Sequence, residues 1–181
     1  GQFLSNKTGA YNRNQAIKPE VNAVETFSID ESAAAGFRNN GYGVVMTHVK
    51  DGIARGTAAV VTLAGTNENQ SILKSKAAQV FSFDKGISTQ TYPSSLMGSI
   101  ALLRQTYLDA KWYATKPASE GVNLSLEAFN ANASLPQIFV ADDKWSTLRA
   151  DRIAKEFGTQ YIIRGADNGY QRIDELAKIK A

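Results

Sequence analysis

The side chains that could carry chemistry in this chain are one histidine and two acids that follow predicted strands. His48 is the only histidine and ends an apolar run of strand length, while Asp142 and Asp143 follow a second such run. Barrel and open-sheet enzymes place catalytic groups at these strand ends. His48, Asp142 and Asp143 are therefore the catalytic candidates. The alternatives are a histidine bonded to backbone atoms and an acid that caps the next helix.

Two segments carry residues that could bind a ligand, and these are Arg55, Arg164 and Asp167. Arg55 lies in residues 52–57, which contain two glycines but lack the GxxxxGK[ST] spacing of a phosphate loop, so a turn is the simpler interpretation. Arg164 and Asp167 lie in residues 164–169, between a predicted strand and a helix, where an anionic group could bind. An ordinary loop rich in Gly and Asn is the alternative there.

Composition predicts a single domain over residues 1–181 and excludes several functions. The 20 Lys and Arg and 17 Asp and Glu are scattered without a basic run, so no nucleic-acid partner is expected. The lack of cysteine excludes disulfides, thiolate nucleophiles and thiolate-bound metals. No apolar run approaches the roughly 20 residues of a membrane span. A first residue other than Met, without a leader-like segment, favours a processed or excised chain.

The predicted elements alternate between strands and helices in the last third of the chain. Residues 1–29 are expected to form loop and extended pieces that wrap the rest, and residues 30–181 form β/α units. Expected helices cover 33–35, 95–114, 124–130, 145–157 and a segment from 170; expected strands cover 44–49, 58–63, 80–83, 137–140 and 161–163. This order predicts an α/β fold of four to six mostly parallel strands, part of a TIM-barrel-like sheet.

Three segments resemble the imidazolonepropionase-like branch of the amidohydrolases. Residues 93–113 contain MGSIALLRQTYLDAKWY and are similar to the "MGxxALLRQxxxDAxxY" segment of that branch. Residues 41–63 resemble its second barrel strand and the following loop, and residues 148–158 resemble its "ALRIAEEFG" helix. The resemblance covers most of the chain from residue 41 onward.

The resemblance implies a (β/α)8 barrel that uses metal-activated water, usually on zinc, to hydrolyse C–N bonds of amides, cyclic amides or dipeptides. The His-x-His pair of the family's first strand does not occur in this sequence. Residues 140–142 and 164–170 stand where relatives carry further histidines, and here they contain none. One histidine is too few for such a site, so no metal or other cofactor is expected to bind to this chain alone.

Two explanations remain open for the missing ligands. The chain is either an excised piece of a longer protein that supplies them elsewhere, or part of a degenerate barrel that packs against an active domain. In both, the chain is a non-catalytic or incomplete segment of an amidohydrolase-like protein; the alternative is a non-enzymatic scaffold that presents residues 50–57 and 164–170 to a partner. Expected partners are the rest of the barrel, a second amidohydrolase-like domain or a second copy of the chain, because a partial barrel leaves strand edges open. Relatives of this branch are often exported bacterial proteins, which implies a periplasmic or exported location.

Overall fold

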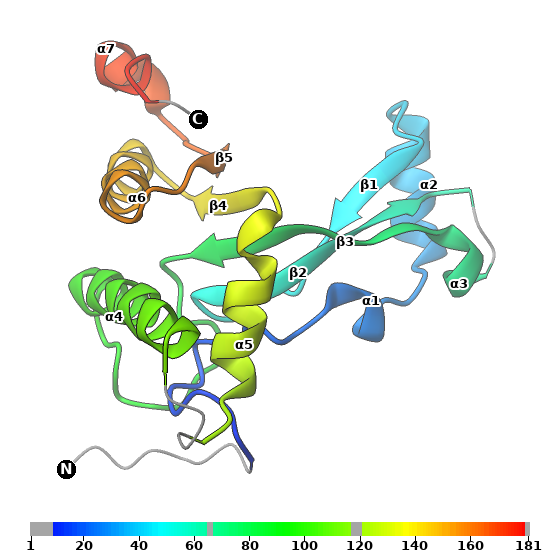
Figure 1. Cartoon of the computed structure of the whole chain (residues 1–181). Helices are drawn as coiled ribbons and strands as arrows, with labels where there is room; N and C mark the ends of the chain where they lie inside the picture. Colours follow the sequence, from blue (N-terminus) through cyan, green and yellow to red (C-terminus); the bar gives the residue numbers. More distant parts are fainter. Residues whose placement is uncertain (1–8, 65–66, 117–120, 180–181) are drawn as a thin grey trace.

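A computed structural model describes residues 9–64, 67–116 and 121–179, which build one curled five-stranded sheet (Figure 1). The strands are β1 (Val44–Thr47), β2 (Ala54–Thr62), β3 (Ile72–Ser82), β4 (Gln137–Ala141) and β5 (Tyr161–Gly165). Their spatial order is their sequence order. β1, β2 and β3 pair antiparallel, whereas β3, β4 and β5 pair parallel. The expected number of strands is confirmed, but only two of the four pairings are parallel.

The parallel half of the sheet follows the sequence prediction closely. Helix α6 (Lys144–Phe157) connects β4 to β5, and Gly158 ends it in the left-handed conformation at φ 68°. Asp143 begins the helix, because its side chain accepts hydrogen bonds from the free N–H groups of the first turn. The chain closes with a 3-10 turn (Gly169–Arg172) and the short helix α7 (Ile173–Leu176).

Helices α4 (Leu96–Ala114) and α5 (Leu124–Ala131) pack together on the same face of the sheet as α6 (Figure 1). Ser95 and Asn123 cap their first turns through side-chain oxygens that accept backbone N–H groups. A 3-10 turn (Asn132–Ser134) then leads into β4. No helix in the described part of the chain is both long enough and apolar enough to cross a bilayer.

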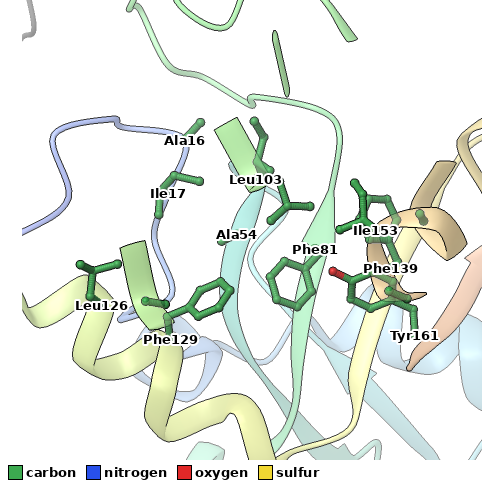
Figure 2. Close-up of a cluster of buried hydrophobic side chains, with 14 of the residues drawn as sticks. Ala16, Ile17, Ala54, Phe81, Leu103, Leu126, Phe129, Phe139, Ile153 and Tyr161 are labelled. Carbon is green, nitrogen blue, oxygen red and sulfur yellow. The ribbon is translucent and has the colours of Figure 1, made fainter. Parts of the chain in front are cut away.

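The main core lies between these helices and the helix-facing side of the strands. Phe81 on β3, Phe139 on β4 and Tyr161 on β5 are all buried, and the ring of Tyr161 contacts those of Phe81 and Phe139 (Figure 2). Leu103 and Ile153 contribute the facing side chains of α4 and α6. A second, smaller cluster fills the opposite face of the sheet and contains Ala58, Ala78, Val80 and Ile138. The second half of β3 and most of β4 therefore bury both of their faces, as expected for parallel strands with covered faces.

The antiparallel half differs from the prediction in three places. The expected strand 44–49 was predicted to be buried on both faces, but β1 ends at Thr47 and exposes Val44 and Met46, because it is an edge strand paired only with β2. The expected turn over residues 52–57 is wrong from Ala54 onward, where β2 begins. The expected strand 80–83 is only the end of β3, which begins at Ile72.

The N-terminal segment lies along the part of β2 that β1 does not reach. Ile17 bridges to Ala54 and Asn22 bridges to Thr57, both in the parallel direction. N-terminal residues therefore cover this part of the β2 edge. Three short or peripheral helices accompany this half: α1 (Ala23–Thr26), α2 (Glu31–Asn39) and α3 (Glu68–Ser71). Helix α2 runs past Gly36, where the sequence predicted its end, because Asp30 caps its start and the helix tolerates one exposed glycine.

Candidate functional site

The carboxyl ends of the three parallel strands meet the start of β2 at one edge of the sheet. Ser82, Val140 and Arg164 stand side by side in register on β3, β4 and β5. The Ser82 N–H donates to the carbonyl of Ile53 at 2.9 Å, which places the start of β2 in the same row. This carboxyl edge is where α/β folds gather their functional side chains.

Arg55 is the most deeply buried charged residue at the carboxyl edge. Its side chain comes from β2, the whole residue is 5% exposed, and Nε donates to the Gly52 carbonyl at 2.9 Å. No carboxylate of the described residues lies within ion-pair distance of its guanidinium. A buried arginine without a paired carboxylate has donors available for a further acceptor.

Several charges surround Arg55 at longer range. Burial lowers the pKa of Arg55, while the carboxylates of Asp84, Asp142 and Asp51 act in the opposite direction and Arg164 adds to the lowering. A guanidinium remains protonated in proteins despite such shifts. The carboxyl edge therefore holds a fixed positive charge with carboxylates around it. This arrangement can bind and orient a charged group.

His48 lies close enough to this cluster to feel its charges. The imidazole is partly buried, and Nδ1 is 3.1 Å from the Val49 carbonyl, which is the backbone-bonded alternative considered from the sequence. Burial is the main cause that lowers the pKa of His48; Arg55, Arg164 and Lys50 lower it further, against the hydrogen bond to Val49. The ring also lines a cavity of about 270 Å³ together with Thr26, Phe27 and Thr47. Burial and the neighbouring cations thus favour the neutral form of His48.

The three acidic candidates have different positions. Asp142 is exposed at the end of β4 and acts on Arg55. Asp143 is the cap of α6, with Oδ1 2.6 Å from the Trp145 nitrogen and 2.8 Å from the Ser146 nitrogen. The hydrogen bond from the Ser146 N–H is the largest cause that lowers the pKa of Asp143, so the capping interpretation is confirmed. Asp167 is exposed in the loop after β5 and is not among the groups that act on Arg55 or His48.

Two carboxylates of this cluster, Asp84 and Asp51, were not predicted from the sequence. Asp84 follows the third strand within two residues, so the rule that selected Asp142 would also have selected it. Asp51 is fixed by an ion pair with Lys18 and by the Ile87 N–H, which donates to Oδ1 at 2.9 Å. Those contacts span long sequence separations, and no local pattern predicts them.

The described residues contain no group of three or more His, Asp or Glu side chains that could hold a metal ion. His48 and Asp142 are therefore not accompanied by the further ligands that a zinc site requires. The carboxyl edge instead offers ion pairing through Arg55 and Arg164.

Comparison with known proteins supports the fold. No protein-family model matches the sequence, and no curated protein matches it significantly. Among solved structures, the chain is similar to the crystal structure of an amidohydrolase from Thermotoga maritima MSB8, with a TM-score of 0.72 and 22% sequence identity over 91% of this chain. The match covers 48% of the amidohydrolase, so the chain spans about half its length. The chain thus has an amidohydrolase-like fold, and the expected α/β class with a partial barrel is confirmed.

The single histidine permits a direct test of the carboxyl-edge cluster. We expect the imidazole of His48 to titrate with a midpoint below the ordinary value of about 6.5, because burial and neighbouring cations disfavour its charged form. Replacing Arg164 by glutamine should raise this midpoint, because one of those cations is removed. The measurement is an NMR titration of the imidazole ring protons, which gives one unambiguous signal set.

Arg152→Gln is the matched control, since Arg152 is exposed on α6 and is not among the groups that act on His48. It should leave the midpoint unchanged. Because the pKa of His48 is lower in the folded chain than in the unfolded chain, the unfolded chain binds a proton at His48 more readily. The free energy of unfolding should therefore fall as the pH drops below about 6.5. A wild-type midpoint at or above 6.5, or equal shifts in both variants, would contradict the described cluster.

Proposed function

We propose that this chain is a non-catalytic half of an amidohydrolase-like barrel whose carboxyl edge positions a charged group with arginine side chains. The observation that carries the proposal is the buried Arg55 at the edge where barrels hold their functional groups, without a paired carboxylate among the described residues. Arg164, in the same row as the strand ends, supplies a second guanidinium.

The barrel part of the proposal rests on the curled sheet and on the extent of the structural match. β5 pairs with β4 on one side, and no described strand pairs with its other side. An open parallel edge of this kind accepts further strands. We propose that the partner of this edge is the rest of a barrel or a second amidohydrolase-like domain. The motif over residues 93–113 supports a parent in the imidazolonepropionase-like branch, which hydrolyses C–N bonds.

Zinc binding and amide hydrolysis test the non-catalytic part of the proposal. Isothermal titration with zinc chloride should show no saturable one-to-one site at micromolar concentrations, because one imidazole and scattered carboxylates cannot enclose the ion. A panel of N-acyl amino acids, cyclic amides and dipeptides should not be turned over by the zinc-supplemented protein. Circular dichroism of the same sample checks that the protein used in these measurements is folded.

His48→Asn is the control variant, since it removes the only imidazole and keeps a polar side chain of similar size. The variant and the wild type should give the same weak zinc response. A one-to-one zinc site that is present in the wild type and lost in His48→Asn would overturn the proposal, as would metal-dependent turnover.

A further inference from the structure

A glutamine in the core has no hydrogen-bond partner. Gln79 on β3 is fully buried, and neither Nε2 nor Oε1 of its amide has a partner in the structure. Leaving both ends of a buried amide unpaired destabilises the folded protein, because neither group regains the hydrogen bonds that it made with water. Buried polar groups in proteins are otherwise nearly always paired, so an unpaired amide requires an explanation.

Gln79 lines a cavity of about 310 Å³ at the amino end of the parallel strands, opposite to the carboxyl edge. The register places Gln79 beside Gln137, the first residue of β4, and Gln137 beside Tyr161, the first residue of β5. The cavity walls come from α4, α5 and the end of α6 with the residues that follow it, which contribute Tyr107, Lys111, Phe129, Asn130, Phe157 and Thr159. The volume is at the lower end of the range of small-molecule sites.

The wall opposite the sheet is aromatic. The rings of Tyr107 and Phe157 stack with centroids 4.6 Å apart and planes 12° apart, and Phe129 meets Tyr107 edge-on at 5.0 Å. These contacts hold flat apolar surfaces in fixed positions. Such surfaces favour a flat ring as the occupant of the cavity.

Several other polar side chains of this lining already have partners. Gln137 Nε2 donates to the carbonyls of Asn132 and Leu135, and Asn130 Nδ2 donates to the carbonyl of Ala110 at 2.9 Å. The Tyr107 hydroxyl is 2.6 Å from that of Tyr161. Among the buried side-chain atoms of this lining, the unpaired donor and the unpaired acceptor therefore belong to one amide, that of Gln79.

We propose that this cavity binds a small planar aromatic molecule with a carboxamide edge, whose N–H and C=O pair with the Oε1 and Nε2 of Gln79. The ring of the ligand packs against Tyr107, Phe129 and Phe157, and two parallel hydrogen bonds satisfy the amide. The free donor and acceptor of Gln79 are complementary to those of a second amide, so that each partner donates once and accepts once. This site is separate from the carboxyl edge and does not depend on the function proposed there.

Benzamide is the probe. Its binding is measured by the shifts of backbone amide signals in two-dimensional NMR of the full chain. We expect millimolar benzamide to shift signals around Gln79 and Phe129 in a saturable manner. N,N-dimethylbenzamide, which keeps the ring and the carbonyl but has no N–H, should bind at least about fivefold more weakly, because the bond to Oε1 is lost.

The matched variants are Gln79→Met and Gln160→Met. Gln79→Met keeps the length of the side chain and removes both polar atoms, so it should fold at least as well as the wild type and lose at least about fivefold in benzamide affinity. Gln160 is exposed and outside this cavity, so Gln160→Met should bind benzamide like the wild type. Thermal unfolding of each variant separates loss of binding from loss of folding.

Two results would overturn the proposal. One is the absence of any saturable shift by benzamide in the wild type. The other is equal affinity in the wild type and a folded Gln79→Met variant. If the wild type binds no benzamide and Gln79→Met is less stable than the wild type, the proposal fails and the partner of the amide is an ordered water molecule, the usual occupant of a polar cavity.

Discussion

Replacing Phe81 by alanine is expected to lower the free energy of unfolding by about 3–5 kcal/mol, the range for removal of a buried phenylalanine ring. Phe81 is fully buried at the centre of the sheet, and its ring centroid lies 5.5 Å from that of Tyr161 and 6.0 Å from that of Phe129. The loss is large because α4, α5 and the strands all contact this ring, so the core cannot close around the gap. Urea unfolding followed by circular dichroism measures the change.

Leu73→Ala on the same strand is the control. Leu73 is 58% exposed near the start of β3, so its truncation should cost no more than about 1 kcal/mol. Similar losses in the two variants would mean that Phe81 is not the centre of the core. A large loss in Phe81→Ala alone supports the packing that Figure 2 shows.

The parallel half of the fold could be predicted because its signals are local. Asp143 at the start of α6, Gly158 at its end and Ser95 at the start of α4 each act on backbone groups within a few residues. The apolar runs of β4 and β5 are short and bounded by turn residues, so their positions follow from sequence alone. Alternation of such strands with helices then gives the parallel order.

The antiparallel half could not be predicted in the same way, because its strands depend on distant partners. Lys74 and Lys76 are exposed on the first half of β3, so that half lacks the apolar run of a buried strand. In β1 the sequence misleads in the opposite direction: Val44 and Met46 are apolar but exposed, so an edge strand has the sequence pattern of a buried one. Only pairing with β2, which is not visible locally, distinguishes the two cases.

The candidate site was predictable in part for the same reason. Asp142 and Arg164 were found by their positions after strands, and both act on Arg55 in the structure. The position of Arg55 was missed, because Gly52 and Gly56 indicated a turn where β2 has an irregular start instead. That irregular start depends on the N-terminal segment, more than 30 residues away in the sequence, which lies against it.

Gly56→Ala is expected to destabilise the protein by about 2–5 kcal/mol, because it combines backbone strain with loss of a hydrogen bond. Gly56 has φ +82°, and a Cβ at this position would lie 1.9 Å from the carbonyl oxygen of Val21. That carbonyl accepts the Thr57 N–H at 2.9 Å and holds the N-terminal segment on β2. The segment must therefore move away, which the measurement detects as a lower unfolding midpoint and faster proteolysis before residue 30.

Gly36→Ala provides the opposite case with the same chemical change. Gly36 lies within α2, and a Cβ there meets no atom within 4 Å. Alanine should therefore stabilise the helix by about 0.5–1 kcal/mol, since it restricts the unfolded chain and adds no strain. Equal stability of the two variants would contradict the packing of the N-terminal segment on β2. The start of β2, which contains Arg55, would then lack the contacts with that segment that hold it at the carboxyl edge.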